Sequence, residues 1–138
     1  SPPASSPAAD ALNDAGVAAW RRGDRAAAEA ALRTAVRAAP DSASGHANLG
    51  MVLCERRQLD EGYASLREAV RLQPERTGLR VNLANALVAG NRMAEAIREY
   101  RDVLRAEPGH VRATANLAKP LLDVCDWDGA ESLAADLI

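Results

Sequence analysis

The chain has 138 residues, enough for one domain or for about four units of a helical repeat. Hydrophobic residues make up 48% of it without a single phenylalanine, and the formal net charge is only −2. Because acidic and basic residues are interleaved and form no broad basic field, the composition argues against nucleic-acid binding. No apolar run reaches the roughly 18 residues of a membrane-spanning helix, so we predict no membrane partner.

The two cysteines, Cys54 and Cys125, form neither a CxxC motif nor any metal-ligand spacing. We therefore predict two reduced thiols in a cytoplasmic protein, with no metal and no cofactor. The chain also shows no basic and apolar leader segment at its start.

Residues 1–8 read SPPASSPA, a proline- and serine-rich stretch with nothing to bury. Such a composition predicts a flexible tail. From Ala9 onward the sequence becomes periodic. Pro40, Pro74 and Pro108 recur at intervals of 34 residues, and each follows a segment of helical character. This spacing divides the chain into repeats at 9–42, 43–76 and 77–110, with a shortened fourth repeat at 111–138.

Matching positions of the repeats carry matching residues. The spacing of the apolar positions predicts two helices per repeat, here called helix A and helix B. Small residues stand where the two backbones should meet, because a larger side chain there would force the helices apart. These small residues are Gly16, Gly50, Ala84 and Ala118 in helix A, and Ala28, Gly62, Ala96 and Ala130 in helix B.

The fourth repeat departs from this pattern. Pro120 falls within its helix A, where it cannot donate a hydrogen bond to the carbonyl of Asn116 and should kink the helix. The repeat ends on the apolar pair Leu137 and Ile138, whereas the end of a repeat array needs a polar face. This uncapped end predicts either a continuing chain or self-association through the last repeat.

The 34-residue unit, the small residues and the recurring proline resemble the tetratricopeptide repeat family over residues 9–138. The resemblance implies an all-α fold, an α-solenoid of about four helix–turn–helix units wound as a right-handed superhelix. It also implies that helix A of each repeat lines a concave groove that binds a protein or peptide partner.

We find no catalytic constellation in this segment. His46 and His110 stand in different phases of the repeat, and neither has a serine or cysteine partner placed as a nucleophile. The sequence contains no glycine-rich phosphate loop, and its carboxylates are spread over helix surfaces rich in arginine.

A polar column recurs at the sixth position of the repeats. It consists of Asp14, Asn48, Asn82 and Asn116. An asparagine amide offers both a donor and an acceptor, so a column of them could hold an extended peptide by its backbone. The resemblance places this position in the groove, and Asn85, Lys119 and Arg112 are expected to face the same way.

A narrower resemblance rests on two features, the repeats HANLG, RVNLANAL and TANLA and the segment LLDVCDWDG at 121–129. They are similar to the repeat region of O-linked N-acetylglucosamine transferases and SPINDLY proteins, and to the segment where those repeats join the catalytic region. The resemblance implies a substrate-selecting arm of a protein O-glycosyltransferase, whose catalytic residues would lie beyond Ile138. Two alternatives stay open. One is a scaffold or self-association module, and the other is a co-chaperone that binds peptide carboxylates.

Overall fold

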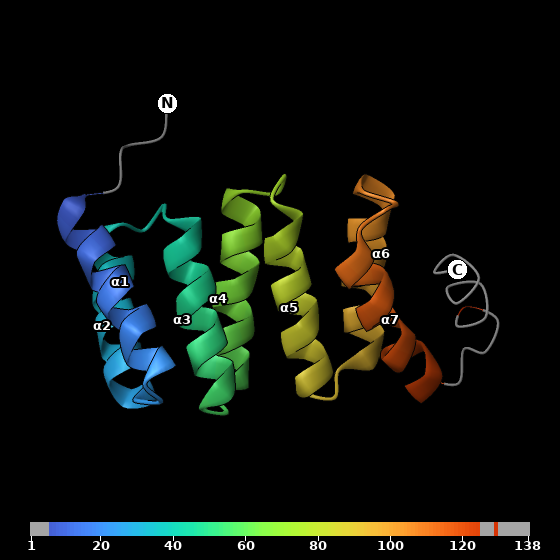
Figure 1. Cartoon of the computed structure of the whole chain (residues 1–138), viewed down its shortest axis with the longest axis horizontal. Helices are drawn as coiled ribbons and strands as arrows, with labels where there is room; N and C mark the ends of the chain where they lie inside the picture. Colours follow the sequence, from blue (N-terminus) through green and yellow to red (C-terminus); the bar gives the residue numbers. More distant parts are fainter. Residues whose placement is uncertain (1–5, 125–128, 130–138) are drawn as a thin grey trace. The chain divides into compact units, whose positions relative to one another are not determined.

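The structure, a computed structural model, describes residues 6–124 and residue 129 of the chain. These residues form helices and no strand, as the sequence predicts (Figure 1). The chain divides into an N-terminal body, Ser1–Glu75, and a C-terminal body, Arg76–Ile138. The N-terminal body contains α1 (Pro7–Arg21), α2 (Arg25–Ala38), α3 (Ala43–Glu55) and α4 (Leu59–Leu72); the C-terminal body contains α5 (Thr77–Ala89), α6 (Met93–Ala106) and α7 (Val111–Asp123).

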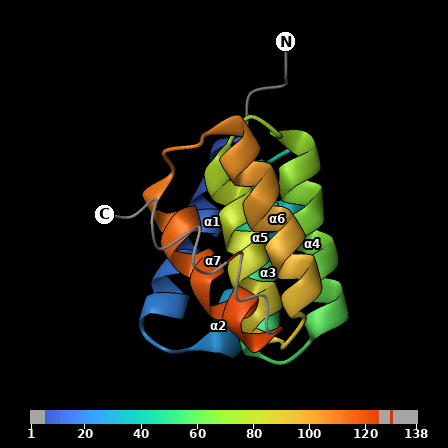
Figure 2. The same cartoon turned by 90° about the vertical axis from the view of Figure 1, so that its right-hand side faces the viewer.

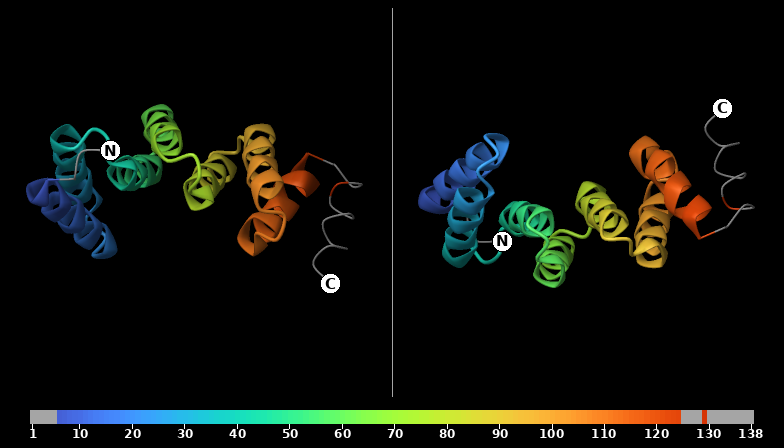
Figure 3. Two further views of the ribbon diagram at one scale, coloured as in Figure 1. Left: turned by 90° about the horizontal axis from the view of Figure 1, so that it is seen from above. Right: turned by 90° about the horizontal axis from the view of Figure 1, so that it is seen from below.

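Helices α1, α3, α5 and α7 are the predicted helices A, and α2, α4 and α6 are the predicted helices B of the first three repeats. Apart from residue 129, the predicted helix B of the fourth repeat lies outside the described residues, as do Cys125, Asp126 and Trp127. Within each hairpin the two helices run antiparallel and pack side by side (Figure 3).

Side-chain caps fix the starts of four helices. Ser6, Asp24 and Ser42 each accept a hydrogen bond from the backbone N–H three residues on, and His110 Nδ1 does the same for α7. Each bond satisfies one of the unpaired N–H groups of a first helical turn. Because α1 begins at Pro7, a residue well suited to the first helical position, Pro7 and Ala8 belong to a helix and not to the predicted tail.

The turn between helix A and helix B has the same backbone conformation in three repeats. Gly23, Arg57 and Asn91, which are spaced by 34 residues, have φ values of 83°, 65° and 62°. Glycine and asparagine tolerate this left-handed region, whereas arginine carries a steric cost there. Glycine and asparagine are common turn residues, so Gly23 and Asn91 signal these turns in the sequence, whereas Arg57 does not.

The hairpins of the N-terminal body close on small residues, as predicted. A Cβ atom added to Gly16 would lie 2.6 Å from Leu32 Cγ, and one added to Gly50 would lie 2.7 Å from Leu66 Cγ. The space beside both glycines is therefore already filled by a leucine of helix B. Around them lies an apolar core that Trp20 and Val36 pack against: Ala19, Ala28, Leu32, Leu49, Val52 and Leu53.

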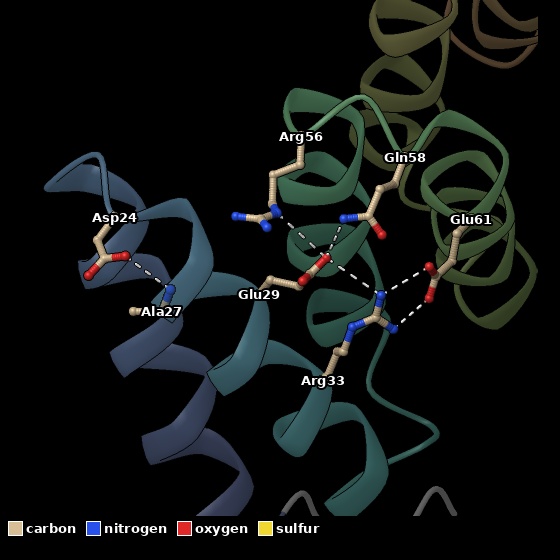
Figure 4. Close-up of polar contacts among 7 residues, drawn as sticks. All are labelled: Asp24, Ala27, Glu29, Arg33, Arg56, Gln58 and Glu61. Carbon is tan, nitrogen blue, oxygen red and sulfur yellow. Dashed lines mark hydrogen bonds and ion pairs between the residues drawn. The ribbon is translucent and has the colours of Figure 1, made fainter.

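A polar network ties the first repeat to the second within this body (Figure 4). Arg33 of α2 donates two hydrogen bonds to Glu61 of α4, at 2.5 and 2.9 Å. Glu29, one turn before Arg33, accepts a 2.9 Å hydrogen bond from Gln58 Nε2 and lies 3.8 Å from Arg56 Nε. These contacts fix the second hairpin against α2, beside the apolar core.

In the C-terminal body, α6 packs against both α5 and α7 (Figure 2). Tyr100 of α6 is 1% exposed, and Leu83, Leu87 and Val103 are also buried in this body. Helix α7 continues through the buried Pro120 to Asp123. Proline inside the helix therefore does not end it, and the Val124 N–H still reaches the Pro120 carbonyl at 3.1 Å.

Candidate functional site

The six residues predicted to bind a peptide lie on helices A of the two bodies. Asn48 is on α3 of the N-terminal body; Asn82 and Asn85 are on α5, and Arg112, Asn116 and Lys119 are on α7 of the C-terminal body. The four asparagines are half-buried, whereas the lysine and the arginine are exposed. The column is thus polar but only partly open to solvent.

In the N-terminal body, Asn48 is joined to the preceding helix A. Its Nδ2 donates a 3.0 Å hydrogen bond to Oδ1 of Asn13 on α1. The bond fixes which way the Asn48 amide points. It leaves the Asn48 carbonyl oxygen and one N–H without a partner among the described residues.

In the C-terminal body, three polar side chains converge on one oxygen. Asn85 Oδ1 accepts a 3.0 Å hydrogen bond from Asn116 Nδ2 and a second, short one from the Tyr100 hydroxyl. Each of the three helices described in this body contributes, because Asn85 comes from α5, Tyr100 from α6 and Asn116 from α7. Because α7 continues through Pro120, which lies one turn beyond Asn116, the proline does not prevent Asn116 from reaching Asn85.

A hollow of about 450 Å³ opens over this cluster. Its polar lining consists of Asn85, Tyr100, Asn116 and Lys119, and its apolar lining consists of Val88, Ala89 and Ala115. Three of the six predicted site residues, Asn85, Asn116 and Lys119, therefore share one concave surface. An apolar hollow with a few converging polar groups is the usual form of a ligand site.

The surroundings of Tyr100 favour its neutral form. Burial raises the pKa of Tyr100 to about 12, although the positive charge of Arg112 opposes this rise. At neutral pH the hydroxyl therefore keeps its proton and remains a hydrogen-bond donor to Asn85.

The two basic residues of α7 differ in their contacts. Lys119 Nζ pairs with Asp123 Oδ2, one turn further along the same helix. Arg112 is exposed and is not among the residues that line the hollow. Asn82 lies on α5 outside the hollow as well, so the three asparagines of the column are not equivalent.

Sequence reasoning missed Tyr100 as a site residue. It occupies a position held by Leu32 and Leu66 in the first two repeats, so the pattern predicts a core residue. The one signal in the sequence is that Tyr100 brings a hydroxyl group to a repeat position where the first two repeats have leucine. Asn13, the partner of Asn48, lies outside the polar column and is not among the residues that the sequence predicts for the site.

The described residues show neither a metal-binding cluster nor a membrane-spanning helix. No group of three or more metal-binding side chains occurs in that part of the chain. No described helix combines the length and the apolar character needed to cross a membrane.

Successive helical hairpins with small residues at their crossings define a helical-repeat protein. The model of the tetratricopeptide repeat family matches residues 7–77 and 81–137, which is most of the chain. The chain therefore belongs to the tetratricopeptide repeat family. No curated protein matches it significantly in sequence.

Several solved structures resemble the chain. An O-GlcNAc transferase from Thermobaculum terrenum is 30% identical with a TM-score of 0.72, and the match covers 83% of this chain but 22% of the transferase. MamA is 18% identical with a TM-score of 0.82, covering 91% of this chain and 73% of MamA. The second tetratricopeptide domain of human RPAP3, solved with the HSP70 peptide SGPTIEEVD, is 21% identical with a TM-score of 0.73. This match covers 81% of this chain and 93% of the RPAP3 domain. The last two likenesses establish the fold alone.

Proposed function

We propose that this chain is a protein-interaction module that binds extended peptide segments along its helices A. The observation that carries the proposal is the Asn116 amide, which lines the hollow. One of its N–H groups is used by Asn85, and its carbonyl oxygen and second N–H have no partner among the described residues. One donor and one acceptor on the same group match the C=O and N–H of a peptide unit.

Asn48 supports the same function in the N-terminal body. Its amide is also held by one hydrogen bond, from Nδ2 to Asn13, and keeps one donor and one acceptor. Each net hydrogen bond to a peptide contributes roughly 0.5–1.5 kcal/mol, so several amides are needed for useful affinity. Asn82 is the third member of the column that we assign to this role.

We further propose that the module is the substrate-recognition arm of a protein O-glycosyltransferase located in the cytoplasm. Two observations support this finer assignment. They are the LLDVCDWDG segment and the 30% identity to an O-GlcNAc transferase of which the chain covers 22%. Any sugar transfer would then depend on chain outside this sequence.

The test combines binding and activity. Replacing Asn48, Asn82 and Asn116 together with alanine should weaken binding to an immobilised array of serine- and threonine-containing peptides by at least about tenfold. Helicity, measured by circular dichroism, should not change. Thr34→Ala on α2, whose hydroxyl is hydrogen-bonded to the Ala30 carbonyl and to Arg37 of the same helix, is the control. Equal binding by the triple variant would exclude the peptide role, and unchanged glycosylation of peptides by the full-length parent carrying the triple variant would exclude the finer one.

A second candidate function is self-association. It is favoured by three exposed aliphatic residues on or just after α7: Val111, Leu122 and Val124, which are 72%, 44% and 46% exposed. If this face joins two copies, Val111→Asp and Leu122→Asp should shift the mass measured by sedimentation towards the monomer. The asparagine variants should leave the mass unchanged.

A further inference from the structure

The hydrogen bonds beside the hollow of the C-terminal body determine whether the Asn85 side chain can donate to a ligand or accept from it. The carbonyl oxygen of Asn85 has two lone pairs, and both are occupied, one by the Tyr100 hydroxyl and one by Asn116 Nδ2. What remains of the Asn85 amide is its NH₂ group, which has no partner among the described residues. The Asn85 side chain can therefore only donate to a ligand.

Tyr100 decides this orientation. An asparagine amide can turn over and exchange its donor and acceptor ends, but the buried hydroxyl of Tyr100 needs an acceptor. Turning Asn85 over by itself would place its NH₂ against the NH₂ of Asn116 and would leave the Tyr100 proton without its acceptor. The first two repeats have Leu32 and Leu66 at the equivalent position, so only the third of these three repeats has a hydroxyl there.

Charge contributes less than hydrogen bonding to ligand recognition in this hollow. Lys119 at the edge of the hollow is paired with Asp123, which balances its charge locally. Arg112 is exposed and does not line the hollow. A ligand group is thus selected for accepting hydrogen bonds more than for being negative. The walls of Val88, Ala89 and Ala115 suit the aliphatic stem that leads to such a group.

We propose that the hollow is a specificity subsite for one side chain of the bound peptide, and that this side chain ends in a carbonyl oxygen. Glutamine and glutamate, and their shorter homologues, are the residues of this kind. Asn85 donates to the oxygen, and Tyr100 is a positioning residue that acts through Asn85. The inference rests on the proposed peptide-binding function and adds the class of side chain that is selected.

The test uses fluorescein-labelled nonapeptides of alanine and serine with one central guest residue, measured by fluorescence anisotropy. Guests are glutamine, glutamate and methionine, which is close in size to glutamine but lacks the carbonyl oxygen. With the native chain we expect glutamine and glutamate peptides to bind within about threefold of each other. Each should bind about three- to tenfold more tightly than the methionine peptide, the effect of one net hydrogen bond.

Two variants separate the roles of the residues. Asn85→Asp keeps an oxygen facing Tyr100 and Asn116 but replaces the donor with a second, charged acceptor. Asn85→Asp should lower the affinity for the glutamate peptide at least about tenfold relative to the affinity for the glutamine peptide, because the NH₂ group of glutamine can donate to the new carboxylate. Tyr100→Phe frees one lone pair and lets the amide turn over, so the preference for glutamate over methionine should fall, whereas glutamine can pair with either end of the amide and should keep its preference. Asn48→Ala in the N-terminal body is the control and should weaken all three peptides while keeping their order.

A second readout does not depend on the rest of the peptide. N-acetylglutamine methylamide should shift the side-chain NH₂ resonances of Asn85 in a ¹⁵N NMR titration, whereas N-acetylmethionine methylamide should not. If the peptides bind without any guest preference, or if the glutamine analogue leaves these resonances unmoved, the subsite is excluded. If the analogue shifts them while no peptide binds, the subsite stands and the proposed peptide-binding function fails.

Discussion

Cys54 of α3 occupies the space that a side chain at Gly62 of α4 would need. A Cβ atom at Gly62 would lie 2.5 Å from Cys54 Sγ, and 3.1 Å from both the Cys54 nitrogen and the Gly50 carbonyl oxygen. The repeat pattern has alanine at this position in the first and third repeats, where Ala28 and Ala96 are both fully buried. In the second repeat the thiol fills the room of the missing methyl group, so glycine there does not leave a gap.

Gly62→Ala should therefore destabilise the protein even though alanine is the better helix former. The methyl group must displace both a side chain and nearby backbone, and overpacking of this kind costs about 1–3 kcal/mol. The gain in helix propensity returns up to about 1 kcal/mol, so we expect a net loss of up to about 2 kcal/mol in the free energy of unfolding. Urea denaturation followed by circular dichroism measures it.

The double variant Cys54→Ala, Gly62→Ala tests the cause. With the thiol removed, Gly62→Ala should cost at least about 0.5 kcal/mol less than it does in the native background. Part of the cost should remain, because the backbone contacts at 3.1 Å are unchanged. Equal costs in both backgrounds would show that Cys54 does not fill this space. Gly78→Ala on α5, where a Cβ atom would meet nothing within 4 Å, should not destabilise the protein.

The turn at Arg57 gives a prediction of opposite sign. Arginine at φ 65° pays a steric cost that glycine avoids, while glycine increases the entropy of the unfolded chain. The first effect is larger, so Arg57→Gly should raise the free energy of unfolding by about 0.5–1 kcal/mol. Gly23→Ala, at φ 83°, should lower it by about 1 kcal/mol, and Asn91→Gly should change it little. A loss of stability in Arg57→Gly would contradict this account.

The sequence specifies the hairpins better than the contacts between them. Helix boundaries and close approaches follow from local signals, namely the prolines, the glycines and the capping residues such as Asp24. The left-handed turn at Arg57 and the hydroxyl of Tyr100 could not be found in this way. Arginine does not normally indicate a left-handed turn, and a tyrosine in a core position does not reveal which group its hydroxyl will contact.

In the candidate site, too, the sequence predicts the repeated residues but not their contacts. The repeat treats Asn48, Asn82 and Asn116 as equivalent, yet their surroundings depend on the residue that faces each of them. Asn13 faces Asn48, and Asn85 faces Asn116. These partners stand at different positions of their own repeats, so the column alone could not predict the pairs. Only the packing of one helix A against the next brings them together.

The Arg33–Glu61 pair should contribute stability that depends on pH. The hydrogen bond from Arg33 lowers the pKa of Glu61 below its usual value. A lowered pKa in the folded state means that the stabilisation is present above the ordinary pKa of about 4.3 and is lost as pH falls through the folded value. Because the Glu61 side chain is 49% exposed, the contribution should be below about 1 kcal/mol.

Glu61→Gln tests this pair. The difference in stability between the native chain and the variant should be measurable at pH 7 and should shrink below about pH 4, as well as at high salt. Asp60→Asn is the matched control, since the neighbouring carboxylate forms no ion pair among the described residues. A difference that stays constant down to pH 3 would mean that the Arg33 contact does not depend on the charge of Glu61.

Tyr100 should titrate far above an ordinary tyrosine. Its pKa is raised to about 12, mainly because burial disfavours the phenolate, whereas an exposed tyrosine titrates near 10. Since the folded pKa lies above the unfolded one, its contribution to stability is complete below about pH 10 and is lost as pH rises through 12. The native chain should therefore lose stability between these values more steeply than Tyr100→Phe does.

Ultraviolet absorbance of tyrosinate measures the titration directly. The chain has two tyrosines, so Tyr63→Phe leaves Tyr100 as the sole tyrosine, and its absorbance should rise in one step near pH 12. Arg112→Ala should move the step higher, because the arginine charge favours the phenolate. If Tyr63→Phe titrates near pH 10, Tyr100 is not held as a buried donor. Its hydroxyl could then no longer fix the Asn85 amide on which the specificity subsite depends.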